Sequence, residues 1–200
     1  KLDLVLRGQA GQGLLESYND EAIATADENI LNSTRSTDFL TPKTTASKAF
    51  RDAVLELAST EAFARPFVNS GRLSTAIHYP QSSLNTPDAQ AWNGGVAPGS
   101  PALDAPVNGA WLLPHLGDHF VLLVNGEGHS GWTQAVPADV ELLDITQWAG
   151  DLSLLQQRYA LQPGCGYLIR PDHYVAARWQ SPVSAAAVQG SVARAKGGLQ

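Results

Sequence analysis

The chain has 200 residues, of which 44% are hydrophobic and 16% charged. That is enough apolar material for one large or two small domains with a buried core, and it excludes a disordered polyampholyte. A net charge of −6, from 13 basic and 19 acidic residues, argues against a surface that binds nucleic acid. No apolar run approaches the roughly 20 residues of a membrane-spanning helix, and no signal peptide is recognisable. We therefore expect a cytoplasmic protein that binds neither nucleic acid nor a membrane.

Two amphipathic helices are predicted in the first 78 residues. From residue 14 to about 41, apolar side chains recur at helical spacing, and charged side chains such as Glu21 take the other positions. A second helix, with Ser47 as its N-cap, would place Phe50, Val54 and Leu57 on one face. Two such stripes form one seam rather than a core, so both helices need a further partner, inside or outside this chain.

Residues 79–110 are rich in proline and glycine, a composition that resists helix and strand. We interpret this stretch as a linker or a draped loop and place a domain boundary there. The expected division is a helical segment at 1–78, a linker at 79–110 and a second domain at 111–200.

The last 90 residues or so alternate between strand and helix patterns. Strands are predicted at 119–124 and 140–145, and a helix at 151–160. Two further strands, 167–170 and 174–179, form a hairpin, and Ser181 with Pro182 would begin a final helix. This order predicts an α/β or α+β sandwich.

The turn of that hairpin carries a specific expectation. A type I turn closed by a bulge favours a positive φ at its last position, where this sequence has His173. We therefore predict a left-handed His173, at a cost of about 1 kcal/mol for a residue other than glycine.

Two motifs suggest chemistry, but each lacks a required part. Residues 8–13 resemble a glycine-rich phosphate loop, yet residues 1–7 are predicted to form a helix rather than a strand, and Glu16 takes the third glycine position. Residues 128–132 resemble a Gly-x-Ser-x-Gly nucleophile elbow, but Trp132 replaces its second glycine. A helix connector and a surface turn are the better interpretations.

No other residue type forms a recognisable site. The single cysteine, Cys165, excludes a disulfide within the chain and a Cys-x-x-Cys pair, and it has no basic neighbour in sequence to activate it. The five histidines show no metal-ligand spacing. We therefore assign no catalytic, cofactor-binding or metal-binding residue in this chain.

Several stretches together match one family. Residues 1–8 with 14–18, then 26–39, 50–58 and 69–74, resemble the segment that follows the flavin site of class A FAD-dependent aromatic monooxygenases. Residues 168–179 are similar to the stretch L-V-R-P-D-G-Y-V-A-W-R of the same family, with His173 in place of its glycine. The resemblance is to the phenol hydroxylase and 3-(3-hydroxyphenyl)propionate hydroxylase type, and it spans essentially the whole chain.

This resemblance implies the carboxy-terminal part of an enzyme that hydroxylates an aromatic substrate with FAD, NAD(P)H and O2. The dinucleotide fingerprint and the Gly-Asp motif of the family would lie upstream of Lys1. A chain that begins at Lys1 and contains no methionine is expected to be processed or cut from something longer. Residues 111–200 would be the family's thioredoxin-like domain, which lacks a redox dithiol.

Two functions remain open. In the first, the chain is a structural, non-catalytic part of the hydroxylase, binds no cofactor by itself and packs on the upstream FAD-binding domain of the same polypeptide. In the second, it is a stand-alone thioredoxin-like module for binding or dimerisation. In both, we expect the first helices to present an apolar face that a missing domain or a second copy covers. That face comprises Leu15, Ile23, Phe50, Val54 and Leu57.

Overall fold

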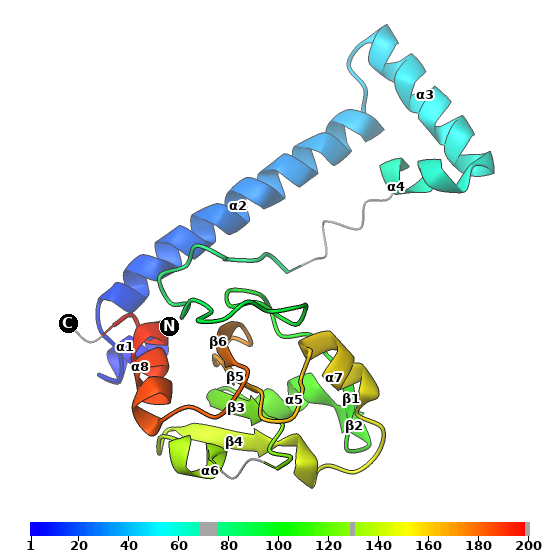
Figure 1. Ribbon diagram of the computed structural model, residues 1–200. Helices are drawn as coiled ribbons and strands as arrows, with labels where there is room; N and C mark the ends of the chain where they lie inside the picture. Colours follow the sequence, from blue (N-terminus) through cyan, green and yellow to red (C-terminus); the bar gives the residue numbers. More distant parts are fainter. Residues whose placement is uncertain (69–75, 129–130, 199–200) are drawn as a thin grey trace. The chain divides into compact units, whose positions relative to one another are not determined.

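The computed structural model describes residues 1–68, 76–128 and 131–198 (Figure 1). The chain divides into two compact units, which differ from the domains expected from the sequence. One comprises Lys1–Glu21 and His78–Gln200, and we call it the sheet unit. The other is Ala22–Ile77, which we call the helical arm. Across the described parts of the chain, no helix is both long and apolar enough to cross a membrane.

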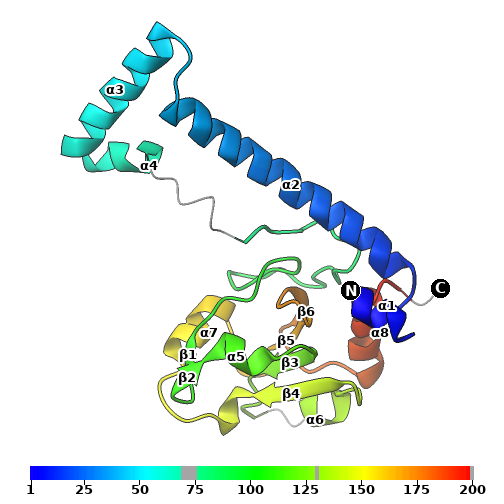
Figure 2. The ribbon, with the colours of Figure 1, turned by 180° about the vertical axis from the view of Figure 1, so that it is seen from behind.

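The sheet unit is built on a four-stranded mixed sheet with the order β4-β3-β5-β6 (Figure 2). These strands are β3 (Phe120–Val124), β4 (Val140–Asp144), β5 (Gly166–Ile169) and β6 (Val175–Trp179). β3 pairs in parallel with β4 and antiparallel with β5, and β5 pairs antiparallel with β6. All four strands predicted from the sequence are confirmed.

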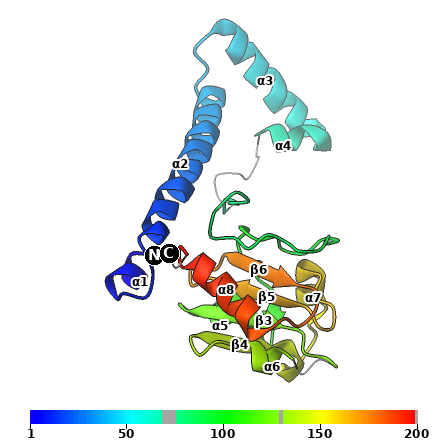
Figure 3. The same ribbon diagram turned by 60° about the vertical axis from the view of Figure 1, so that its left-hand side comes forward.

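Side chains of β3 alternate between two apolar clusters, one on each face of the sheet. Val121 and Leu123 belong to the first cluster with residues of α5 (Leu112–Leu116) and α7 (Ser153–Tyr159). Leu122 and Val124 belong to the second, with residues of α6 (Trp132–Ala135) and α8 (Ala185–Ala195), and α8 crosses the sheet in Figure 3. Because both faces are covered, β3 is a continuous apolar run. The fold is α+β, as predicted.

The final helix begins later than predicted. Ser184, not Ser181, is the N-cap of α8, and its hydroxyl accepts a hydrogen bond from the backbone N–H of Ala187. Both serines have the cap chemistry, but the chain turns into a helix only after Val183, so Pro182 lies before the first turn.

The β5–β6 turn matches its prediction. His173 has a φ of 63°, in the left-handed region. Its backbone N–H donates to the carbonyl of Arg170, which closes the turn. The imidazole Nε2 also lies 2.9 Å from the carbonyl oxygen of Gly117, a contact in which the ring nitrogen must donate.

The proline- and glycine-rich residues 79–110 drape over the sheet unit rather than span a gap between units. Backbone N–H groups of Thr86 and Gly99 donate to carbonyls of β6, each at 2.8 Å. The short strands β1 (Pro106–Val107) and β2 (Ala110–Trp111) pair near the end of the segment. The segment packs on the sheet because some of its small apolar side chains belong to the first cluster. They are Val96, Ala102, Ala105 and Val107.

The helical arm contains most of α2 (Gly13–Leu40), then α3 (Thr45–Thr60), the 3-10 turn η1 (Ala62–Ala64) and α4 (Arg65–Val68). Both predicted helices are present. The N-cap of α3 is Thr44 rather than Ser47. Ser47 is the third helical residue, and the two side chains form a reciprocal capping box.

The arm buries almost none of its apolar side chains. Among its described residues, Ala64 is the one buried hydrophobic residue. Ten large apolar side chains of the arm are at least 40% exposed, among them Ile23, Phe50 and Leu57 of the predicted face. They are Ile23, Ile30, Leu31, Leu40, Phe50, Leu55, Leu57, Phe63, Phe67 and Val68.

Candidate functional site

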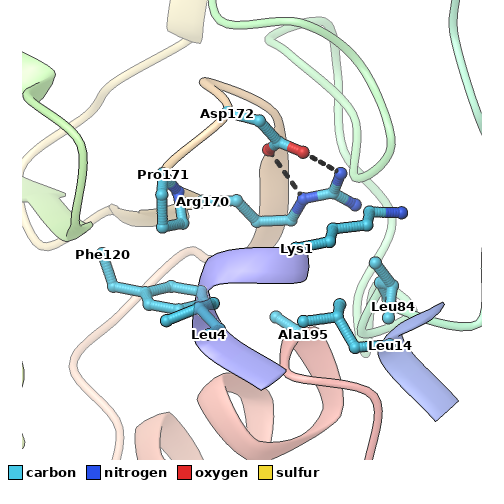
Figure 4. Close-up of a pocket in the computed structure, with 9 residues that line it drawn as sticks. All are labelled: Lys1, Leu4, Leu14, Leu84, Phe120, Arg170, Pro171, Asp172 and Ala195. Atoms are coloured by element: carbon cyan, nitrogen blue, oxygen red, sulfur yellow. Dashed lines mark hydrogen bonds and ion pairs between the residues drawn. The ribbon is translucent and has the colours of Figure 1, made fainter. Parts of the chain in front are cut away.

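A cavity of about 150 Å³ in the sheet unit is bordered by the charged turn between β5 and β6 (Figure 4). Its lining comes from both ends of the chain, from the draped loop, from β3 and from that turn. The lining residues are Lys1, Leu4, Leu14, Leu84, Phe120, Arg170, Pro171, Asp172 and Ala195. The walls are mainly apolar, and of the charged side chains at its edge Lys1 and Arg170 are largely buried, whereas Asp172 is partly exposed.

Arg170 follows β5 directly, and its side chain is only 3% exposed. The turn folds Asp172 back so that its carboxylate accepts hydrogen bonds from Nε, at 2.9 Å, and from Nη2 of Arg170. The ring of Tyr174 lies 5.4 Å from the guanidinium carbon, within the range of a cation–π contact. The hairpin itself therefore fixes the plane of the guanidinium.

Glu21 lies on α2, 149 residues before Arg170, with a side chain that is 10% exposed. Nη1 and Nη2 of Arg170 donate to its two carboxylate oxygens at 3.1 and 3.3 Å. Lys1 Nζ donates at 2.6 Å and Ser82 Oγ at 2.7 Å. We call Lys1, Glu21, Ser82, Arg170 and Asp172 the Arg170 cluster.

Both central groups of the Arg170 cluster stay charged near neutral pH. Burial acts to raise the pKa of Glu21, but the hydrogen bonds and charge of Arg170, with the hydrogen bond from Lys1, hold it below its ordinary value. Burial acts to lower the pKa of Arg170, but Asp172 and Glu21 raise it above its ordinary value. The two cations of the cluster, Lys1 and Arg170, match the charge of its two anions, Glu21 and Asp172.

This arrangement can bind and orient, but it is unsuited to proton transfer. A general acid or base works best with a pKa near the working pH. The pKa values of Glu21 and Arg170 both move away from neutrality. Their donors and acceptors also engage one another across segments far apart in sequence. The Arg170 cluster therefore joins α2 to the hairpin and has no reactive group of its own.

A second buried arginine joins the draped loop to β6. Nε and Nη2 of Arg178 donate to the two carboxylate oxygens of Asp88 at 2.9 and 2.6 Å. Nη1 donates to the carbonyl of Gly94 at 3.2 Å, and the guanidinium carbon lies 4.4 Å from the ring centre of Trp92. Burial opposes the charge of Arg178, but Asp88 raises its pKa overall.

The glycine-rich residues 8–13 connect two helices, as predicted. α1 (Leu2–Leu6) precedes them where a dinucleotide loop would need a strand. A β-carbon on Gly13 would overlap the carbonyl of Gly197, and one on Gly197, at φ +91°, would overlap the backbone N of Leu14. These glycines serve backbone-to-backbone packing and do not fit a pyrophosphate.

The described residues of the other motifs include no reactive group. In the elbow-like residues 128–132, His129 and Ser130 lie outside the described residues. Trp132, at the position of the missing glycine, is buried, and its Nε1 donates to the carbonyl of Gly164 at 3.0 Å. Cys165 is buried, which raises the pKa of its thiol and disfavours the reactive thiolate.

Metal ligation also has no support in the parts of the chain that the structure describes. No three His, Cys, Asp or Glu side chains gather there closely enough to hold an ion. His119 instead contacts the carboxylate of Glu141, at the edge strand β4.

The Arg170 cluster was not predicted from the sequence. The pattern of α2 assigns Glu21 to the polar face, whereas the structure buries it beneath Arg170. Nothing within the helix distinguishes Glu21 from Asp20, because the partner lies 149 residues away. The one available signal is that Arg170 and Asp172 fall inside the stretch that carries the family resemblance.

Comparisons with known proteins gave structural matches only. A scan against protein-family models and a search of curated proteins found no match. Solved structures, in contrast, match over nearly the whole chain. The rebeccamycin biosynthetic enzyme RebC with reduced flavin gives a TM-score of 0.66 at 24% identity, covering 98% of this chain and 38% of RebC.

Two further structures show the same relation. The flavin-dependent monooxygenase PieE, in complex with FAD and substrate, has a TM-score of 0.64 at 20% identity, with 98% of this chain and 42% of PieE covered. Aklavinone-11 hydroxylase, with FAD and aklavinone, has a TM-score of 0.57 at 23% identity, with 97% and 37% covered. The chain thus spans about two fifths of the length of these enzymes. It has the fold of that part of the FAD-dependent hydroxylases, which confirms at the level of fold the resemblance seen in the sequence.

Proposed function

We propose that this chain is the carboxy-terminal part of a cytoplasmic flavoprotein that hydroxylates an aromatic substrate with FAD, NAD(P)H and O2. Within that enzyme these residues are structural, and the chain alone neither binds FAD nor catalyses hydroxylation. FAD, when bound by the upstream part, supplies the oxygen chemistry. The glycine-rich residues 8–13 follow a helix and pack on Gly197, so they do not fit the cofactor.

The coverage of the structural matches carries the proposal. The match with RebC covers 98% of this chain, including the helical arm, but only 38% of the length of RebC. A stand-alone module would be expected to match a comparable share of its neighbours. The remaining three fifths of such an enzyme would contain the dinucleotide-binding part.

The helical arm supports the same proposal from energetics. Its exposed apolar side chains, such as Phe50 and Phe67 at 66% and 70%, gain nothing in the chain as it stands. Burying a side chain of this size is worth about 1.5–3 kcal/mol. We assign the upstream FAD-binding domain of the same polypeptide as the partner that covers this apolar surface.

We also propose that the sheet unit is a thioredoxin-like domain. Numbered along the chain, its strands stand in the order 2-1-3-4, the first pair is parallel, and the last two form an antiparallel hairpin followed by α8. Disulfide exchange needs an attacking and a resolving thiol, and the sequence has Cys165 alone. We expect insulin reduction in its presence to stay at the uncatalysed rate.

The alternative is a stand-alone thioredoxin-like module that binds a partner or dimerises through the arm. The exposed apolar residues of the arm favour this candidate too, since a second copy would also cover them. It predicts a dimer that needs no flavin protein, whereas the first proposal predicts that the upstream domain competes with self-association.

The test is to express the reading frame that encodes this chain with whatever precedes Lys1, beside the 200-residue chain alone. We expect the longer product to bind flavin, absorb near 450 nm and oxidise NAD(P)H faster with an aromatic substrate. The short chain, purified with excess FAD, should be colourless. A frame without a glycine-rich strand–helix unit, or a stoichiometric flavin spectrum for the short chain, would overturn the proposal.

A further inference from the structure

The attachment of residues 1–21 to the rest of the sheet unit contains little apolar packing. Leu14 is the one buried hydrophobic residue among them, at 2% exposed. α1 buries no residue at all. The two other buried side chains of this segment are polar, Ser17 and Glu21. Polar contacts therefore contribute much of what holds this segment to the rest of the sheet unit.

Glu21 is the last residue of the sheet unit before the arm begins at Ala22. α2 continues without interruption from Gly13 to Leu40. The helical turn that contains Glu21 therefore leads directly into the part of α2 that belongs to the arm. The carboxylate of Glu21 receives hydrogen bonds from three other segments, through Lys1, Ser82 and Arg170. Whatever fixes Glu21 thus fixes the beginning of α2.

We propose that Arg170 is a positioning residue, which acts through Glu21 to hold the first turns of α2 on the sheet unit. Its importance for the enzyme rests on the proposed function, because α2 leads into the apolar arm that the FAD-binding domain would cover. Arg170 has the geometry for this role. Asp172 and Tyr174 fix its guanidinium, and two nitrogens reach the two oxygens of Glu21.

A two-pronged contact of this kind requires arginine. The guanidinium is planar and presents its N–H groups as a fork that matches a carboxylate. A lysine at position 170 would keep the positive charge but could not bond Glu21 and Asp172 in the same way. Arg170→Lys therefore removes the orientation while leaving the charge balance of the cluster unchanged.

The experiment is hydrogen exchange, read by mass spectrometry, on the full 200-residue chain and its variants. In Arg170→Lys we expect the amides of residues 17–21 to exchange at least tenfold faster, while those of β3 and β5 keep their protection. The matched control is Arg178→Lys, which alters a buried arginine on the same hairpin that bonds Asp88 instead. It should leave residues 17–21 unchanged.

The proposal also requires that Arg170 act through Glu21. In a Glu21→Gln background, Arg170→Lys should add no further increase at residues 17–21, because the coupled contact is already lost. Unchanged exchange at residues 17–21 in Arg170→Lys would overturn the proposal. An equal increase in exchange across β3 and β5 would also overturn it. So would a double variant in which the increases caused by Glu21→Gln and Arg170→Lys simply add. None of these measurements needs flavin, so a failure of the proposed function, seen in the flavin spectrum, is distinguishable from a failure of this inference.

Discussion

The sheet unit and the helical arm are opposites in how they use apolar residues. The sheet unit buries whole strands, and every residue of β3 is buried. The arm has well-formed helices, including one with a capping box, but its described residues bury a single hydrophobic residue, Ala64. Helix formation and core formation are therefore separate in this chain. Local sequence can specify a helix, while the helix still needs a partner to stabilise it.

The contrast also separates two kinds of contact. Inside the sheet unit, apolar clusters on both faces of the sheet supply the stability. On α2, at the boundary with the arm, the contact is instead a buried ion pair between Glu21 and Arg170. An intact buried ion pair adds little net stability, but removing one of its partners is costly because the other charge is left buried and unpaired.

The largest expected effect comes from truncating one residue in each unit. Leu122→Ala, in β3, should lower the free energy of unfolding by about 3–4 kcal/mol, because the side chain is fully buried and would leave a cavity. Phe50→Ala, on α3, should change it by less than about 0.5 kcal/mol, because Phe50 is 66% exposed. Urea unfolding curves of the two variants measure both. Similar losses would show that the arm has a core of its own.

Next in size is Glu21→Gln, which removes one partner from a buried ion pair. We expect a loss of about 3 kcal/mol at neutral pH, near the low end for such a pair, because Asp172 still compensates Arg170. Thermal or urea unfolding measures the loss. The matched control, Asp20→Asn, changes the neighbouring carboxylate on the exposed side of α2 and should have almost no effect.

The same pair has a defined pH dependence. The pKa of Glu21 in the folded chain lies below its ordinary value of 4.5. Its contribution is therefore fully present above that ordinary value and is lost as the pH falls through the lower, folded value. The difference in unfolding free energy between the parent chain and Glu21→Gln should shrink on acidification below pH 4.5. A difference that grows there would contradict the assignment.

A smaller effect is expected at the start of α3. Thr44→Ala removes the side chain that accepts from the Ser47 backbone N–H at 3.1 Å, at a cost to the helix of about 1 kcal/mol. Since the arm has little packing to compensate, the far-ultraviolet circular dichroism should show lost helix. Thr45→Ala, one residue into the helix, is the control and should lose none.

The smallest effect concerns the turn at His173. His173→Gly relieves the left-handed strain, worth about 1 kcal/mol. It also removes the contact between Nε2 and the carbonyl of Gly117, worth about 0.5–1.5 kcal/mol. The two effects oppose each other, so the net change in unfolding free energy should stay within about 0.5 kcal/mol. A gain of the full strain energy would mean that the imidazole contact contributes nothing.

Periodicity predicted the elements well, because each strand and long helix carries its pattern within itself. It failed where two residues offered the same local chemistry. Thr44 and Ser47 can both cap α3, and Ser181 and Ser184 can both cap α8, so only the path of the flanking chain decides between them.

Contacts between residues far apart in the chain could not be predicted from the sequence for another reason. A helical pattern distinguishes a polar from an apolar face, and by that rule Glu21 belongs to the polar one. Its burial depends on Arg170, which lies 149 residues later in the chain, in the turn between β5 and β6. The draped loop is similar, since Val96 and Ala105 have no periodic context that would mark them as core residues.

The most direct test of the central claim, that the arm lacks a core of its own, is limited proteolysis with trypsin. Arg35 on α2 in the arm and Arg194 on α8 in the sheet unit are both exposed on helices, so cleavage after each reports local unfolding rather than access. The digestion is run at a dilution where the mass in solution is that of one chain. We expect cleavage after Arg35 to be at least tenfold faster than cleavage after Arg194. Equal rates, or faster cleavage after Arg194, would contradict the account.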